Sequence, residues 1–176
     1  MAHLKKFISI ILVMALALSI LPIIPAIAQP SVQPIVWYTF DNVEGTTVKD
    51  MSGNNNEGTL YGWGKTGSSG IDGNALILNE NNENNGYMQL PSGIFKGVND
   101  FTVATWVNVK SAESYARIFD FGMNSNGGNM FLTPFGGGQL VFAITNSGAG
   151  SEQRLTYTQL STTDEWLHIA ITMQGD

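Results

Sequence analysis

The chain of 176 residues has no cysteine and only two histidines. The first absence excludes disulfides, thiolate nucleophiles and cysteine-ligated zinc. His3 lies in an N-terminal leader, so that His168 is the only histidine left for the remainder. A Ser-His-Asp site would have to use it, and no Gly-x-Ser-x-Gly motif accompanies it. We expect His168 to be structural, bonded to a neighbouring backbone group.

Basic residues are also scarce, with eight Lys and Arg against 14 Asp and Glu. Two of the lysines, Lys5 and Lys6, belong to the leader, which leaves six bases and a formal charge of −8 for the mature part. Proteins that bind nucleic acid or anionic membranes need a basic surface. The composition disfavours both partners and favours a neutral ligand or a cation.

Long apolar runs are missing too. The run Phe7–Leu21 has about 15 residues, fewer than the roughly 20 of a membrane-spanning helix. Ala26-Ile27-Ala28 follows with the small residues that a signal peptidase reads. We interpret residues 1–28 as a secretory signal peptide, with an uncleaved anchor as the alternative. The mature protein is then secreted or held at the cell surface, without a membrane segment.

The rest of the chain is long enough for one domain. We expect a lead-in at residues 29–34 and a single domain over 35–176. Clusters of Gly and Asn, which tolerate positive φ, separate short apolar segments at the spacing of strands in a sandwich or barrel. The predicted strands are Ile35–Phe40, Gly58–Trp63, Ala75–Leu78, Tyr87–Leu90, Phe101–Val109, Ala116–Phe121, Met130–Thr133, Leu140–Thr145, Arg154–Thr158 and Trp166–Met173.

Two of these segments alternate clearly. Phe101–Val109 places Phe101, Val103 and Val107 on one face and Trp106 on the other. Trp166–Met173 likewise separates an apolar face from one that contains His168. At most one helical turn is expected, at Ser92–Gly97. The pattern predicts an all-β fold of two antiparallel sheets.

The end of the chain carries a further expectation. The strand Trp166–Met173 is followed by Gln174-Gly175-Asp176, which begins a turn. A hydrophobic strand without a return partner leaves an open sheet edge, which native proteins avoid. We therefore expect the domain to be incomplete at its C-terminus, with at least one more strand after Asp176.

Six segments together resemble the laminin-G-like branch of the concanavalin A-like lectin/glucanase superfamily. In chain order they are Trp37-Tyr-Thr-Phe-Asp, Thr46-Thr-Val-Lys-Asp-Met-Ser-Gly-Asn-Asn-Asn-Glu-Gly-Thr-Leu, Gly73-Asn-Ala-Leu-Ile-Leu-Asn, Asp100-Phe-Thr-Val-Ala-Thr-Trp-Val, Arg117-Ile-Phe-Asp-Phe-Gly and Trp166-Leu-His-Ile-Ala-Ile-Thr. The resemblance implies a jelly-roll sandwich. It also implies a bacterial exported protein, in which such domains bind carbohydrate or act as spacers beside glycoside hydrolases or surface proteins.

Glycosidase activity of this chain is not expected. The hydrolases of the superfamily carry a Glu-x-Asp-x-x-Glu strand, and the chain has no such motif. Glu80 and Glu83 lie among asparagines, and Glu152 and Glu165 lie in turns, where acids usually face solvent. Retaining hydrolysis needs two carboxyls about 5 Å apart, one of them with a raised pKa.

A calcium site is a more plausible use of the acids. Asp41, Asn42, Asp50 and Asn54 offer hard oxygen ligands, although no EF-hand loop is present. The resemblance implies one structural calcium ion held by Asp41 and the Gly73-Asn74 turn. The alternative is that Asp41 and Asp50 cap turns.

Aromatic and amide side chains near turns suit a carbohydrate, because aromatic rings with a polar end favour half-wet surfaces. The candidate ligand-binding residues are Trp63, Tyr87, Tyr115, Arg117, Asn124 and Gln139. Trp37, Trp106 and Trp166 lie inside strands and are assigned to packing.

The sequence leads to three hypotheses. The first is an exported, non-catalytic module that binds neutral polysaccharide or cell-surface glycan, as an accessory domain of a glycoside hydrolase or surface protein. The second is the N-terminal part of a glycosidase whose catalytic domain follows in cis. The third is a structural spacer or protein-adhesion domain.

Overall fold

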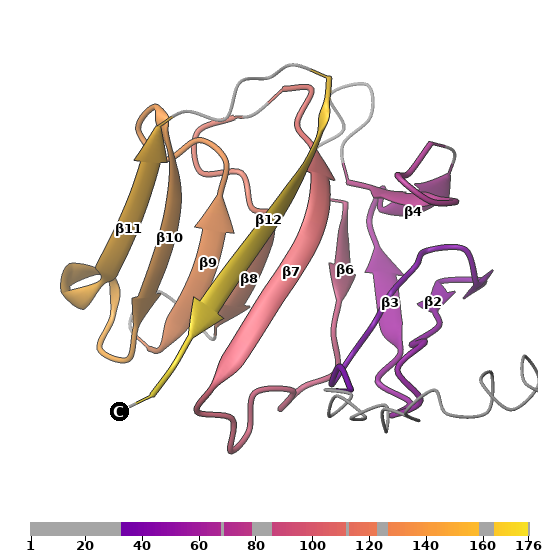
Figure 1. The fold of residues 1–176 in the computed structure, drawn as a ribbon, viewed down its shortest axis with the longest axis horizontal. Helices are drawn as coiled ribbons and strands as arrows, with labels where there is room; N and C mark the ends of the chain where they lie inside the picture. The colour runs from indigo at the N-terminus through magenta and orange to yellow at the C-terminus, as the bar shows by residue number, and fades with distance from the viewer. Residues whose placement is uncertain are drawn as a thin grey trace, which may run out of the picture. The chain divides into compact units, whose positions relative to one another are not determined.

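Antiparallel strands make up nearly all of the regular structure in the computed structural model (Figure 1). The structure describes residues 33–67, 69–78, 86–111, 113–122, 127–158 and 164–175. The predicted signal peptide, residues 1–28, lies outside these ranges. Residues Ile35–Asp176 form one compact unit. Its described part holds twelve strands and a 3-10 turn at Ala149–Ser151, without an α-helix.

The sheet that holds the core has the strand order β11-β10-β9-β8. Its strands are β8 (Phe119–Gly122), β9 (Asn129–Thr133), β10 (Gln139–Thr145) and β11 (Gln153–Thr158). Met130, Leu132 and Phe142 on one face form a buried cluster. Phe131 and Val141 on the opposite face are buried as well. Burial on both faces explains why β9 and β10 are continuously apolar in sequence.

The strands β7 (Phe101–Asn108) and β12 (Trp166–Met173) form the second layer. They pair antiparallel along eight residues, from Phe101 opposite Met173 to Asn108 opposite Trp166. Phe101, Ile169 and Ile171 pack on the cluster of the first sheet. In Figure 1 the pair crosses in front of β8 and β9. The all-β sandwich of antiparallel sheets that the alternation predicted is thus confirmed.

The N-terminal half forms two smaller sheets. One has the order β1-β2-β3-β6, and β4 pairs with β5 in the other. In the sheet β1-β2-β3-β6, Val48 is fully buried and Leu60 is 8% exposed. The strands are β1 (Val43–Glu44), β2 (Thr47–Val48), β3 (Gly58–Tyr61), β4 (Lys65–Gly67), β5 (Ala75–Ile77) and β6 (Tyr87–Gln89).

Some element predictions were wrong. Ile35–Phe40 is not a strand, because Asp50 Oδ1 accepts the Trp37 N–H and Phe40 has a φ of 65°. The strands β1, β2 and β4 were missed, since two or three residues are too few to show an alternation. The predicted strand Ala116–Phe121 begins three residues later, at Phe119.

Candidate functional site

Three exposed aromatic residues lie in or directly after the paired strands β3 and β6. Tyr61 and Tyr87 are opposite each other in the strand register, and their rings stack with centroids 5.1 Å apart and an angle of 11°. They are 43% and 50% exposed, and Trp63, in the turn after β3, is 61% exposed. We call Tyr61, Trp63 and Tyr87 the aromatic cluster. It includes the sequence-predicted residues Trp63 and Tyr87, whose backbone segments lie next to each other at Gly64 and Gly86.

A tight turn after β3 positions Trp63. The Gly64 N–H donates to Tyr61 O at 3.1 Å, and Gly62 has a φ of 58°. A Cβ on Gly64 would lie 2.9 Å from Tyr87 O, and one on Gly86 would lie 3.0 Å from the Trp63 carbonyl carbon. Glycine at positions 64 and 86 therefore allows the Trp63 turn to pack directly against the start of β6.

A second group of predicted residues meets on the outward face of β8 and β9. Arg117 Nη1 donates to Tyr115 O at 2.6 Å, and Arg117 Nε donates to Asp120 at 3.1 Å. The guanidinium carbon lies 3.9 Å from the centre of the Phe131 ring. The Arg117 guanidinium thus packs on the buried Phe131 ring. Its Nε and Nη1 already donate hydrogen bonds within the protein.

The other predicted ligand residues do not all join these groups. Gln139 is exposed at the start of β10, opposite Thr158 in β11. Asn124 lies outside the described residues. The sequence-predicted set is therefore divided between the aromatic cluster on β3–β6 and the Arg117 group on β8–β9.

Glu152 corrects the expectation that turn acids face solvent. Its side chain is 5% exposed, and its Oε2 accepts hydrogen bonds from Nε and Nη2 of Arg154 at 2.9 and 2.6 Å. Hydrogen bonding to Glu152 raises the pKa of Arg154. The pair is a local ion pair at the start of β11, and sequence alone shows only that the two residues are near each other.

Asp50 organises the asparagine-rich loop before β3. Its carboxylate accepts the N–H groups of Trp37, Ser52 and Asn56, each at 2.9 Å, and the Ser52 hydroxyl at 2.7 Å. Burial acts to raise the pKa of Asp50, but these four hydrogen bonds outweigh it and lower the pKa to about 2. Asp50 thus acts as a cap of this loop.

Tyr38 packs beside the same loop, and its hydroxyl donates to Asn56 O. Burial raises the pKa of Tyr38, and the carboxylates of Asp50 and Glu57 raise it further, to about 12. The hydroxyl therefore stays a hydrogen-bond donor at every physiological pH.

The predicted calcium ligands Asp41 and Asn74 lie next to each other. Asp41 Oδ1 accepts the Asn74 N–H at 2.8 Å across 33 residues of sequence. Calcium takes six to eight oxygen ligands, so this pair supplies only part of a coordination sphere. Among the described residues, no three Asp, Glu or His side chains cluster as metal ligands would.

Two tryptophans assigned to packing are half exposed instead. Trp37 is 54% exposed and Trp106 is 49% exposed. Trp106 lies on the outward face of β7, where its ring contacts the His168 ring with centroids 5.0 Å apart. Among the described residues, the His168 side chain makes this ring contact but no hydrogen bond to a backbone group, contrary to expectation.

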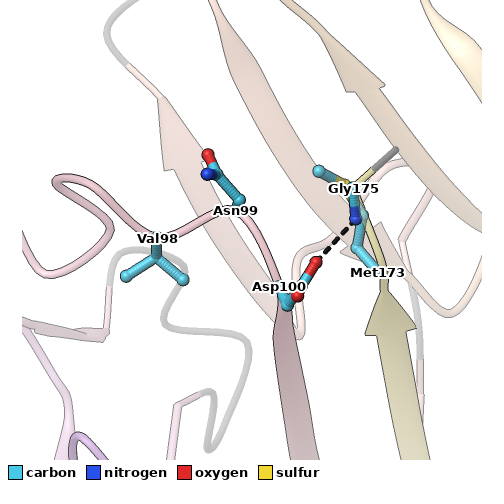
Figure 2. Close-up of a pocket in the computed structure, with 5 residues that line it drawn as sticks. All are labelled: Val98, Asn99, Asp100, Met173 and Gly175. Carbon is cyan, nitrogen blue, oxygen red and sulfur yellow. Dashed lines mark hydrogen bonds between the residues drawn. The ribbon is translucent and has the colours of Figure 1, made fainter.

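A hollow of about 460 Å³ lies where β7 begins and β12 ends. Figure 2 shows its lining, in which the Gly175 N–H donates to Asp100 Oδ1 at 2.7 Å. This bond ties the end of β12 to the start of β7. The carboxylate of Asp100 therefore has a structural role here.

A family model described as the concanavalin A-like lectin/glucanases superfamily matches residues 81–176. A similar solved structure is the S-layer domain-containing protein (residues 221–444) from Clostridium thermocellum, which is 34% identical with a TM-score of 0.60. The match covers 74% of this chain and 60% of that one. No curated protein matches the chain.

The binding domain of Paraclostridial Mosquitocidal Protein 1 is also similar, with 21% identity and a TM-score of 0.53. This match covers 75% of this chain and 34% of that one, and it shows the fold alone. The chain thus spans less than two thirds of the length of either structure. In the part of the chain that the structure describes, no helix has the length and apolar character of a membrane span.

Proposed function

Because the chain belongs to the concanavalin A-like lectin/glucanase superfamily, we propose that it is a non-catalytic module that binds neutral polysaccharide or cell-surface glycan outside the cell. The aromatic cluster carries this proposal. Its three rings are 43–61% exposed although they lie next to a packed sheet. Exposed rings with a polar end are the groups that stack on the apolar face of a sugar.

The hydrogen bonds of two described acids, Glu152 and Asp50, support binding without catalysis. Glu152 has a buried side chain, but its Oε2 is bonded twice to Arg154 and is not available to protonate a substrate. Asp50 is engaged by four hydrogen bonds and holds a loop. The hydrogen bonds of both carboxylates are thus made within the fold.

An extracellular location fits two observations. The sequence predicts a signal peptide at residues 1–28, and a 34% identical structure comes from an S-layer domain-containing protein. We propose that the module is secreted or displayed on the cell surface, as part of a surface protein or of a glycoside hydrolase.

Affinity electrophoresis in gels that contain laminarin, xyloglucan or galactomannan tests the proposal. We expect retardation by at least one polysaccharide and an affinity about tenfold lower in Trp63→Ala or Tyr87→Ala, because such ring contacts contribute about 1.4 kcal/mol. Tyr157→Ala is the matched control, since Tyr157 is 68% exposed and lies on β11. Equal losses in all three variants, or no retardation of the wild type, would contradict the proposal and favour a spacer.

A further inference from the structure

The outward face of the β7–β12 pair is a strip without any formally charged side chain. It consists of the cross-strand pairs Thr102–Thr172, Ala104–Ala170, Trp106–His168 and Asn108–Trp166. Successive pairs on one face of a sheet are about 7 Å apart, so the strip is roughly 20 Å long. We call these eight residues the β7–β12 strip.

Trp106 presents an open aromatic surface in this strip. On one side its neighbours along the strip are Ala104 and Ala170, whose methyl groups are too small to cover an indole, and on the other side they are Asn108 and Trp166. The ring is 49% exposed, and the His168 ring is inclined to it by 58° at 5.0 Å. We call these two rings the shelf, and the imidazole contributes two nitrogens that can form hydrogen bonds.

Hydroxyl and amide groups lie at both ends of the shelf. Thr102 Oγ1 and Thr172 Oγ1 are 3.0 Å apart and share a hydrogen bond. At the other end, Asn108 Nδ2 donates to the backbone and side chain of Asp164. A ligand that covers the shelf therefore meets the two threonine hydroxyls at one end, whereas at the other end the Asn108 amide is bonded to Asp164 and its Oδ1 is buried.

Charged groups border the strip but do not enter it. Lys110 and Asp164 form an ion pair of 3.4 Å beyond one end, and Asp100 is bonded to the Gly175 N–H beyond the other. In a mature chain with a formal charge of −8, a neutral strip of this length is complementary to an uncharged ligand. An apolar ring face with hydroxyls at its border is the chemistry of a neutral pyranose.

We propose that the β7–β12 strip is a second binding site for neutral polysaccharide, in which a sugar ring stacks on Trp106 and a sugar hydroxyl bonds to His168. The class of ligand rests on the proposed function, whereas the residues are different from those of the aromatic cluster. Two sites that bind one polymer raise its apparent affinity above that of either site alone.

Titrations of the ¹⁵N-labelled protein with laminarin, xyloglucan and galactomannan test the second site. We expect the Trp106 indole N–H resonance, identified with Trp106→Phe, to shift on addition of the polysaccharide that is retarded in gels. Trp106→Ala should weaken binding about tenfold and His168→Ala about threefold, since interface truncations fall in this range. Trp37→Ala is the matched control, because Trp37 is 54% exposed and lies outside the strip.

The outcomes separate the two proposals. If Tyr87→Ala weakens binding while Trp106→Ala, Trp106→Phe and the Trp106 resonance are all unaffected, the second site is refuted and the aromatic cluster stands. If the wild type binds none of the three polysaccharides, both proposals fail. If Trp106→Ala alters the size-exclusion volume instead of the affinity, the strip is a contact surface between copies of the chain, and the second site is likewise refuted.

Discussion

Replacing Asp50 by asparagine should destabilise the domain strongly for a residue outside the core. Asparagine keeps one oxygen for the N–H groups that Oδ1 accepts, from Trp37 and Ser52. Its amide nitrogen then faces the Asn56 N–H, which Oδ2 accepts at 2.9 Å in the wild type. Two donors are brought together, and a hydrogen bond to a charged acceptor is lost. Such bonds contribute about 1.5–3 kcal/mol.

We expect Asp50→Asn to lower the free energy of unfolding by about 2–3 kcal/mol. For a domain of this size that corresponds to a melting temperature lower by about 6–10 °C in scanning calorimetry. Asp72→Asn is the matched control, because Asp72 is exposed, and it should melt within about 1 °C of the wild type. An equal melting temperature for Asp50→Asn and Asp72→Asn would refute the role assigned to the Asp50 hydrogen bonds.

The same carboxylate predicts a dependence on pH. The pKa of Asp50 is lowered in the folded state from 3.8 to about 2. The stabilisation that depends on its charge is therefore complete above about pH 4 and is lost as the pH falls through about 2. Since the carboxylate is partly exposed, we expect this charge-dependent part of the free energy of unfolding to be about 1 kcal/mol. Urea titrations at pH 7 and pH 2 should show this loss in the wild type and its absence in Asp50→Asn.

Three further outcomes are expected. Gly73→Ala should lower the free energy of unfolding by about 2 kcal/mol in urea titrations, because the φ of Gly73 is 72° and a Cβ would lie 2.3 Å from Asp41 Oδ1. Gly93 is the control, since its φ is 80° but no atom lies within 4 Å of an added Cβ. Gly93→Ala should therefore lower the free energy of unfolding by only about half as much. Leu132→Ala should cost about 3 kcal/mol, since Leu132 is 1% exposed, whereas Leu155→Ala, at 69% exposure, should stay within about 0.5 kcal/mol. We also propose that calcium binds weakly at Asp41, with water completing its coordination. A Kd of about 1 mM would stabilise the domain by about 1.4 kcal/mol in 10 mM CaCl₂. The absence of a melting shift against chelator, or an equal shift in Asp41→Asn, would count against this site.

The sequence predicted the strands best where one face of a sheet is dry and the other wet. The alternation in β7 and β12 assigned every residue to its observed face, including Trp106 to the outward face. The assignment of Trp106 to packing was wrong because it relied on its place within a strand rather than on that alternation. In β9 and β10 both faces are buried, and the sequence therefore could not tell which residues contact the second layer.

The candidate sites depend on contacts that no local pattern contains. Tyr61 and Tyr87 meet because β3 pairs with β6 although β4 and β5 lie between them in sequence. Asp50 accepts a hydrogen bond from the Trp37 N–H, 13 residues earlier in the sequence. Because this N–H is bonded to a side chain, Ile35–Phe40 does not form the predicted strand. The burial of Glu152 similarly follows from how its turn packs rather than from its residue type.

The pairing of β7 with β12 determines when a growing chain can complete its core. Phe101 and Met173 are partners, and all four strands of the core sheet are synthesised between them. Until β12 has emerged, Ile169 and Ile171 are missing from the cluster around Leu132. Nascent chains that stop before this strand expose apolar surface and are substrates for chaperones and proteases. Long-range closure of this kind also slows folding, because the intervening loop loses entropy before the contacts form.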